Sequence, residues 1–341
     1  MPIHRLLGLS AAAVLTVGLA ACSSSAPTSD TSDPVSGASG SFPVTVEHAL
    51  GETTIETQPT RVTTIGWGNQ DVALALGVAP VGVDDQTWSM DGSDGLGVYD
   101  WTLDAYDALG ADEPVVFSTA DGTDFEAVAD TQPDLILAGY SGVTEEDYAT
   151  LSEIAPTVAY PDAAWLTPWR DVIKTDSAAL GLADKGQALV DSLEGQIADA
   201  TADSAFEGKK AAFFYMNAAD LSTISIYGQG DSRTAFLADL GFDLPELAGD
   251  VDTFYHDVSA ENADELADID VIVSYGDGDA LLTALRADPL WSTLTAVKNG
   301  AVLSVGSGDA LSGAVTPTAL SIPWMLKDYV ALLDGAVALA K

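Results

Sequence analysis

Two stretches of the chain carry the same succession of polar and apolar positions. "EAVADTQPDLILAGY" (126–140) and "ENADELADIDVIVSY" (261–275) each begin with Glu and turn apolar after an acidic residue, Asp134 or Asp270. Each stretch ends in Tyr, fourteen positions after its Glu. A short apolar run bounded by polar and turn residues is typical of a buried strand. The pattern therefore predicts the same entry into a strand once in each half of the chain.

Strand and helix patterns alternate around both stretches. In the first half we expect strands at 61–66, 78–83, 134–140 and 156–160, and helices at 69–77 and 144–153. In the second half we expect strands at 210–216, 221–228, 268–275 and 300–306, and helices at 232–241 and 281–291. Such alternation predicts parallel sheets with helices on both faces. The expected fold class is α/β, with two Rossmann-like lobes, each a mostly parallel sheet flanked by helices.

A helical pattern separates the two halves. Pro168 suits the first turn of a helix, and apolar residues recur at helical spacing as far as Leu180, with Asp176 as an exception. A second apolar stripe continues over 189–200. We therefore expect a single long helix to join the lobes, with the ligand cleft between them. The expected boundaries are 42–167 for the N-terminal lobe, 168–181 for the joining helix and 182–341 for the C-terminal lobe.

The N-terminus has the pattern of an export signal. A short polar start precedes an apolar stretch, Leu6–Ala21, which is short for a membrane span. The stretch ends in "LAAC", and Cys22 is the only cysteine of the chain, so an internal disulfide is excluded. A free thiol is the simple interpretation, but "LAAC" after a signal resembles the bacterial lipobox, which implies lipidation of Cys22. We expect a signal peptide (1–21), a flexible Ser- and Thr-rich tether (22–41) and a lipid-anchored protein facing away from the cytoplasm.

The charge and the motif content exclude several function classes. Only 12 Lys and Arg oppose 52 Asp and Glu, and a surface with a net charge of −40 repels nucleic acid. His48 and His256 stand alone in the chain, so we expect no metal site. No Gly-x-Ser-x-Gly, Walker or His-Glu-x-x-His motif occurs, so we expect neither an enzyme nor a bound cofactor.

Several stretches together resemble a known family over about residues 43–335. They include the two repeated stretches, "RVTTIGWGNQDVALALGVAPVGV", "YGQGDSRTAFLADLGF" and "DPLWSTLTAVKNGAVLSV". In order and spacing the chain resembles the helix-spined substrate-binding proteins of ATP-binding-cassette (ABC) importers, which serve ferric siderophores, haem and cobalamin. The resemblance implies a monomer that captures a ferric siderophore and delivers it to a permease dimer with its ATPase. Haem or cobalamin as the ligand, and a sensor or scaffold without transport, remain alternatives.

The ligand site is expected where the strands of the two lobes end. Polar and aromatic residues just after strands are the candidates, and for each aromatic residue core packing is the alternative. Arg233 follows a Gly-rich turn, where a guanidinium would suit the oxygens of an anionic chelate; the alternative is a pair with Asp231 or Asp239. Arg170 could face the cleft or bridge to Asp171 or the surroundings of Lys174. The candidate ligand-binding residues are Trp67, Trp88, Tyr140, Trp165, Arg170, Tyr215, Tyr227, Arg233 and Tyr255.

The glutamates that open the repeated stretches are candidates for a second role. In the family each lobe carries one exposed glutamate that docks with arginines of the permease, and Glu126 and Glu261 are the matching positions. Carboxylate–Arg pairs supply geometry as well as energy. The simpler alternative is that each Glu stabilises the N-terminus of a helix, where a negative charge is favourable.

Overall fold

The computed structural model describes residues 40–90, 96–120, 122–250 and 252–340. The expected signal peptide, Cys22 and nearly all of the tether lie outside these residues, so the lipid anchor remains a prediction. Among the helices of the described residues, none is long and apolar enough to cross a bilayer. Both lobes belong to one folded unit, Ser39–Lys341.

The N-terminal lobe is built on a parallel sheet, as predicted. Its strand order is β5-β4-β3-β6-β7, and every pairing in it is parallel. The strands are β3 (Val62–Thr64), β4 (Gly82–Asp84), β5 (Val115–Phe117), β6 (Leu135–Ala138) and β7 (Thr157–Ala159). The helices are α1 (Asn69–Ala75), α2 (Asp100–Leu109), α3 (Phe125–Asp130), α4 (Glu145–Ile154) and α5 (Trp169–Ala179). A hairpin of β1 (Val44–His48) and β2 (Gly51–Ile55) and a short 3-10 turn, η1 (Thr87–Ser89), complete the lobe.

The C-terminal lobe has a mixed sheet of order β10-β9-β8-β11-β12. Its strands are β8 (Ala211–Asn217), β9 (Asp220–Tyr227), β10 (Tyr255–Ser259), β11 (Val271–Ser274) and β12 (Val302–Ser304). Around it lie α7 (Ser232–Asp239), η2 (Glu246–Ala248), η3 (Ala260–Leu266), α8 (Gly278–Ala287), η4 (Trp291–Thr293), α9 (Thr295–Asn299), α10 (Ala310–Ala314) and α11 (Ser321–Leu339). β11 pairs parallel with both β8 and β12, whereas β9 pairs antiparallel with both β8 and β10. The expectation of a mostly parallel sheet holds less well here, because the two-residue connection between β8 and β9 permits only an antiparallel pair.

The repeated acidic residues have the same structural role in both lobes. Asp134 precedes β6, and its carboxylate accepts hydrogen bonds from the backbone N–H groups of Thr60 (2.8 Å) and Arg61 (2.9 Å), just before β3. Asp270 precedes β11, and its carboxylate accepts from the N–H of Lys210 (2.9 Å), just before β8. In each lobe the carboxylate satisfies a backbone donor at the start of the neighbouring parallel strand. The repeat in the sequence is therefore a repeat in the construction of the sheets.

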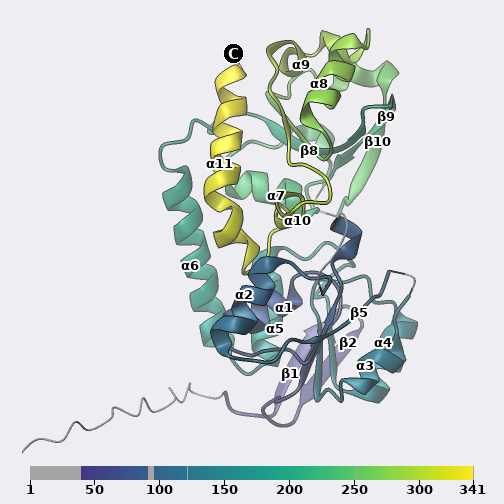
Figure 1. Cartoon of the computed structure of the whole chain (residues 1–341), viewed down its shortest axis with the longest axis vertical. Helices are drawn as coiled ribbons and strands as arrows, with labels where there is room; N and C mark the ends of the chain where they lie inside the picture. Colours follow the sequence, from purple (N-terminus) through teal and green to yellow (C-terminus); the bar gives the residue numbers. More distant parts are fainter. Residues whose placement is uncertain (1–39, 91–95, 121, 251, 341) are drawn as a thin grey trace, which may run out of the picture. The chain divides into compact units, whose positions relative to one another are not determined.

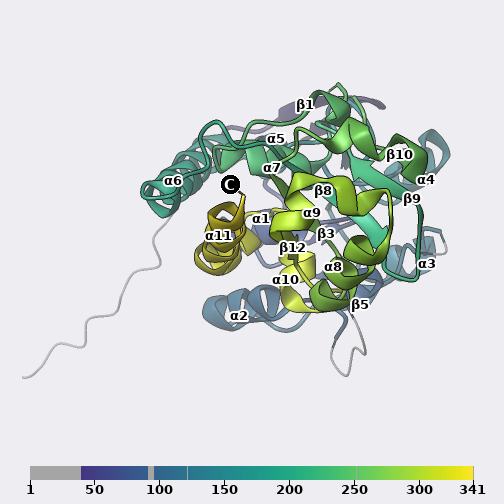
Figure 2. The same cartoon turned by 90° about the horizontal axis from the view of Figure 1, so that it is seen from above.

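The connection between the lobes consists of two helices rather than one. The segment 168–181, expected to join the lobes, forms α5, which packs against α1 and β1 of the N-terminal lobe. Gly181, at φ +68°, ends this helix and lets the chain turn into α6 (Ala183–Thr201). α6 packs on α5 and on α11, and it runs alongside both lobes (Figures 1 and 2). The long joining helix is thus α6.

A second connection ties the lobes together inside the protein. The carboxylate of Asp71, in α1, accepts hydrogen bonds from Trp101 Nε1 (3.1 Å) and Thr102 Oγ1 (2.8 Å) in α2. It also accepts from the hydroxyl of Thr318, in the segment that leads from α10 to α11. The Asp71 side chain is fully buried, and burial raises its pKa to about 6. The C-terminal segment is therefore anchored on the first helix of the N-terminal lobe.

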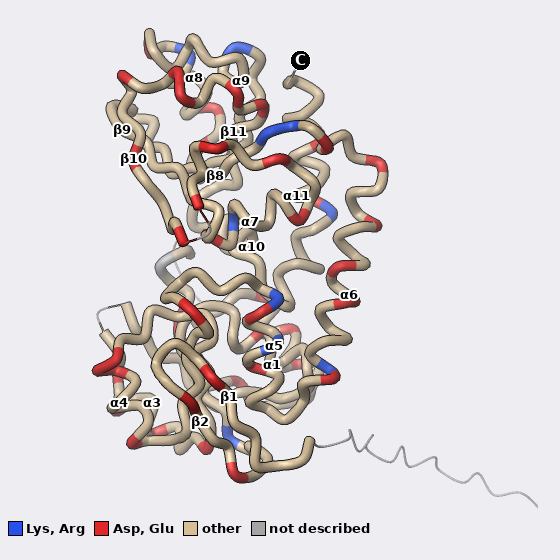
Figure 3. The backbone as a smooth tube through the Cα atoms, turned by 180° about the vertical axis from the view of Figure 1, so that it is seen from behind, with Lys and Arg blue, Asp and Glu red and all other residues tan. Residues whose placement is uncertain are grey.

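Acidic residues are distributed over the surface of both lobes, and basic residues are few (Figure 3). Asp176 is one of the few buried acidic residues: it interrupts the apolar face of α5 and is fully buried. In the described part of the chain neither of its carboxylate oxygens has a hydrogen-bond partner. A Cβ added at Gly139 would lie 2.8 Å from Asp176 Oδ1, so the glycine leaves room for the carboxyl group. Burial raises the pKa of Asp176 well above its ordinary value.

We predict that Asp176→Asn stabilises the protein at neutral pH. Because the folded-state pKa is raised above 3.8, the contribution of Asp176 to stability is greatest below about pH 4 and is lost as the pH rises towards the folded-state pKa. The amide has no charge to desolvate, so the free energy of unfolding near pH 7 should rise by roughly 1–3 kcal/mol. Urea unfolding between about pH 4 and pH 8 measures this change.

The matched control is Asp171→Asn, which removes a carboxylate from the exposed side of the same helix. Asp171 pairs with Lys174 at 3.3 Å, and both side chains are about half exposed (48% each). Such a pair contributes little. An equal effect of the two substitutions, or a destabilised Asp176→Asn near pH 7, would contradict the prediction.

Candidate functional site

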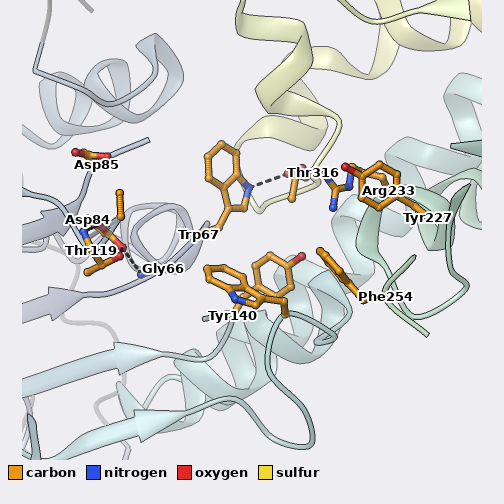
Figure 4. Close-up of a pocket in the computed structure, with 12 residues that line it drawn as sticks. Gly66, Trp67, Asp84, Asp85, Thr119, Tyr140, Tyr227, Arg233, Phe254 and Thr316 are labelled. Atoms are coloured by element: carbon orange, nitrogen blue, oxygen red, sulfur yellow. Dashed lines mark hydrogen bonds between the residues drawn. The ribbon is translucent and has the colours of Figure 1, made fainter. Parts of the chain in front are cut away.

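A cavity of about 550 Å³ lies where the strand ends of the two lobes meet. The N-terminal lobe contributes residues at or after the carboxyl ends of strands β3 to β7, and the C-terminal lobe contributes β9, α7 and neighbouring loops (Figure 4). Ligands bind at this edge of open α/β sheets. The lining residues are Gly66, Trp67, Asp84, Asp85, Thr119, Ala120, Tyr140, Trp165, Tyr227, Arg233, Phe254 and Thr316.

Trp67 lines the cavity but is not an exposed indole. Only 3% of its surface is accessible, and its Nε1–H donates to the carbonyl of Thr316 at 3.1 Å. Gly66 takes φ +85°, and a Cβ there would lie 2.4 Å from the carbonyl oxygen of Tyr140. The glycine before Trp67 therefore allows the close passage of two loops. The indole forms part of the rigid wall of the cavity.

Trp165 is held in an unusual conformation at the cavity. Its φ of 60° falls in the left-handed region, which costs a bulky residue of the order of 1–3 kcal/mol. Its side chain is 38% exposed and packs edge-on against Tyr140, with ring centroids 5.4 Å apart. Strained residues that keep an aromatic ring exposed are concentrated at binding sites. Trp165 is therefore the lining aromatic with the most surface available to a ligand.

The two tyrosines that end the repeated stretches converge on the N-terminus of α7. The hydroxyl of Tyr140 is hydrogen-bonded to Ser232 Oγ at 3.2 Å, across the two lobes. The hydroxyl of Tyr275 accepts from Arg233 Nη1 at 3.1 Å. The repeat thus supports the only basic residue among the described residues that line the cavity.

Arg233 combines the two arrangements that the sequence left open. It lines the cavity, and it pairs with Asp231, which accepts from Nε (2.8 Å) and Nη2 (2.6 Å). The guanidinium carbon also lies 3.9 Å from the ring centroid of Tyr227. Burial lowers the pKa of Arg233, but the Asp231 carboxylate, together with Tyr275 and Tyr227, outweighs burial and holds this pKa well above its ordinary value. Burial raises the pKa of Tyr227 to about 12, so its hydroxyl is neutral at physiological pH.

Residues that the sequence analysis did not name form the opposite, acidic side of the cavity. Asp84 accepts from the N–H groups of Gly66 (2.9 Å) and Thr119 (3.0 Å), and burial raises its pKa to about 6. Asp85 follows it, and its Oδ1 accepts from Thr87 Oγ1 at 2.9 Å. The signal was present, because "VGVDD" places two acids directly after an apolar strand. Because the chain has 52 acidic residues, two adjacent acids did not distinguish this position from many others in the sequence. Phe254 and Thr316 reach the cavity from loops that had no motif.

Three of the candidate residues are not among the described residues that line the cavity. Arg170 pairs with Glu194 (2.6 Å) and Asp239 (2.8 Å), so it links α5 to α6 and α7 instead of facing a ligand. Tyr215 and Tyr255 are more than half exposed, on β8 and β10. Trp88 lies in η1, but its side chain is outside the described part of the structure.

Glu126 and Glu261 are both exposed and occupy equivalent places. Glu126 is in the first turn of α3, capped by Asp124, and Glu261 is in the first turn of η3, capped by Ser259.

In the described residues no group of three or more His, Cys, Asp or Glu is arranged to hold a metal ion.

We predict that Gly142→Ala displaces the indole of Trp165. A Cβ at position 142 would lie 2.4 Å from Trp165 Nε1, so the ring has to move or the loop has to shift, at a cost of roughly 1–3 kcal/mol. Near-ultraviolet circular dichroism and urea unfolding report the change. The substitution should cost much less in a Trp165→Ala background, because the clash is then absent. The control is Gly195→Ala, where an added Cβ meets nothing within 4 Å. Equal costs of Gly142→Ala in both backgrounds would refute this packing.

Comparison with solved structures extends over most of the chain. The ferrichrome complex of PiaA from Streptococcus pneumoniae TIGR4 is 42% identical, with a TM-score of 0.82, and the match covers 87% of this chain and all (100%) of that one.

Among curated proteins, the Fe(3+)-citrate-binding protein YfmC of Bacillus subtilis (strain 168) is 26% identical over 253 residues, which are 74% of this chain and 75% of the relative. The putative ABC transporter substrate-binding lipoprotein YhfQ of the same organism is 32% identical over 148 residues. That match spans 43% of this chain and only 39% of YhfQ.

A family described as periplasmic binding protein matches residues 62–307, which include both five-stranded sheets and nearly all residues of the cavity. The chain belongs to the periplasmic binding protein family.

Proposed function

We propose that this protein is the substrate-binding component of an ABC importer, and that it captures a ferric siderophore outside the cytoplasm. The observation that carries the proposal is the cavity between the lobes, where five aromatic residues and one guanidinium line a volume of about 550 Å³. Sites for organic ligands combine such aromatic walls with a few polar groups. The 42% identity with PiaA, whose structure contains ferrichrome, supports the same choice of ligand.

The cavity suits a large chelate rather than a bare ion. The exposed face of Trp165 and the rings of Tyr227 and Phe254 offer apolar surface to the organic part of the ligand, and Arg233 offers N–H donors to its oxygens. The iron then arrives inside the ligand, and the protein itself needs no cofactor. It binds the chelate and releases it unchanged, without catalysing a reaction.

The N-terminus and the family support the proposed location. "LAAC" at Leu19–Cys22 and a Ser-rich tether predict a lipid-anchored body that stays near the outer face of the cell membrane. YhfQ, the partial relative, is named as a lipoprotein. We propose a monomer that carries its ligand to a permease dimer with its ATPase.

Equilibrium binding by the full-length chain in detergent tests the ligand. Tryptophan emission is followed during titration with ferrichrome, a ferric catecholate, ferric citrate, haem and cobalamin, with iron-free chelators as controls. We expect saturable quenching by a ferric siderophore, and a loss of affinity of roughly tenfold to a hundredfold in Arg233→Ala, because a charge-assisted hydrogen bond is removed. Lys185→Ala, an exposed position on α6, is the control, and melting curves verify folding.

The outcomes separate the alternatives. Binding of haem or cobalamin alone would replace the ligand but retain the importer role. Failure to bind any member of the panel would refute siderophore capture and favour a sensor or scaffold.

We also propose that Glu126 and Glu261 dock the protein on the permease, one glutamate per lobe. Both are exposed and lie in equivalent first turns of α3 and η3. The double variant Glu126→Lys/Glu261→Lys should abolish uptake of radiolabelled iron–siderophore in cells while ligand affinity stays unchanged, because only the docking charges are reversed. Glu153→Lys, another exposed glutamate, on α4, is the control. Normal uptake by the double variant would exclude this docking role.

A further inference from the structure

The charges around the cavity point to a particular class of ferric chelate. We propose that Asp231 neutralises Arg233, so that the cavity accepts uncharged or cationic ferric chelates and discriminates against anionic ones. The inference rests on the proposed function, which concerns ferric siderophores in general, and it corrects the expectation that Arg233 selects an anionic ligand.

The ion pair of Asp231 and Arg233 is complete within the protein. Asp231 is fully buried, and Arg233 is 7% exposed. Both carboxylate oxygens accept from the guanidinium, and Oδ1 also accepts from the backbone N–H of Arg233 at 3.0 Å. Such a bidentate pair has no net charge. A ligand in the cavity therefore meets a dipole instead of an uncompensated cation.

The remaining charges of the lining are negative. Asp84 and Asp85 lie on the N-terminal side of the cavity, and no Lys and no second Arg belongs to its described lining. With Asp231 included, one cation faces three carboxyl groups. The whole protein carries a net charge of −40, so the long-range field also repels anions. Both the local and the global charge disfavour an anionic ligand.

The charge of a ferric chelate depends on its donor groups. Three hydroxamates balance Fe³⁺ and give a neutral complex, whereas tris-catecholate and citrate complexes retain negative charge. Moving an ion from water into a partly buried site is costly unless an opposite charge compensates it. In this cavity Asp231 already supplies the opposite charge to Arg233, so an anionic chelate would lack compensation.

Arg233 still has a role for a neutral ligand. Its guanidinium has more N–H groups than Asp231 and Tyr275 accept, and Tyr227 supports its face. The remaining N–H groups can donate to a ligand oxygen without adding net charge to the cavity. Arg233 thus contributes hydrogen bonds and orientation, and Asp231 determines which ligand charge is accepted.

The test compares affinities for chelates of different charge. Full-length wild-type protein is titrated with neutral ferrichrome, cationic ferrioxamine B, an anionic ferric tris-catecholate and anionic ferric citrate. We expect the uncharged or the cationic chelate to bind at least about tenfold more tightly than either anionic one, a difference equivalent to about 1.4 kcal/mol. Stronger binding of an anionic chelate would refute the inference and leave siderophore capture intact. No binding of any ferric chelate would refute both.

Two variants test the residues behind the selectivity. Asp231→Asn retains a good N-cap for α7 and removes the charge that balances Arg233. In this variant the ratio of the affinity for neutral chelate to the affinity for anionic chelate should be about tenfold smaller than in the wild type. Asp85→Asn keeps the acceptor for Thr87 and removes a lining charge without disturbing the ion pair, so it should shift the preference in the same direction even if Asp231→Asn folds poorly.

The matched control is Asp104→Asn, an exposed position on α2 outside the described lining of the cavity, which changes the net charge by the same amount. Its selectivity should equal that of the wild type. If all three substitutions change the selectivity equally, the net charge of the protein is responsible and the role of Asp231 is refuted. If neither Asp231→Asn nor Asp85→Asn changes it, the charge of the cavity does not select the ligand.

Discussion

The buried carboxylate of Asp71 is the interaction on which the joining of the two lobes depends. It accepts hydrogen bonds from two residues of α2 and from Thr318, which lies about 250 positions further along the chain. Hydrogen bonds to a buried carboxylate are favourable, so the bond from Thr318 helps to hold the segment before α11 on the N-terminal lobe. Its neighbour Thr316 then receives the N–H of Trp67, and the back of the ligand cavity is closed. The position of this segment therefore defines one wall of the cavity.

A second constraint comes from the internal repeat. In each lobe an aspartate accepts a hydrogen bond from a backbone N–H group just before the neighbouring parallel strand. A tyrosine follows the strand that begins directly after this aspartate. Each tyrosine follows the carboxyl end of a strand, β6 or β11, which is the edge where open α/β sheets bind ligands. Tyr140 reaches Ser232 and Tyr275 reaches Arg233, so both lobes contact the same helical N-terminus. This arrangement orients the guanidinium before any ligand binds, which reduces the entropy lost on binding.

Much of the architecture could be predicted, because it depends on local patterns. The alternation of apolar strands with amphipathic helices predicted two α/β lobes, and Gly-rich turns after strands marked Trp67 and Arg233, which both line the cavity. The joining helix was misplaced because α5 and α6 have similar apolar stripes, and only their partners distinguish them: α1 and β1 for α5, α11 for α6. Arg170 was misassigned for a related reason, since its partners Glu194 and Asp239 are remote in sequence. Sequence spacing carries no information on such contacts.

The sequence alone determined the α/β class, the repeated strand entries and the acidic character of the chain, since each of these follows from composition or from neighbours along the chain. The tertiary structure decided which side chains share the cavity. Asp84, Phe254 and Thr316 come from separate segments and meet only after the chain has folded. It also decided the charge of Arg233's surroundings, because a cation two residues from an aspartate can point towards it or away from it. At the N-terminus of α7 the guanidinium of Arg233 points towards Asp231 and pairs with its carboxylate. The effect of a charge in a cavity depends on such pairing and on burial.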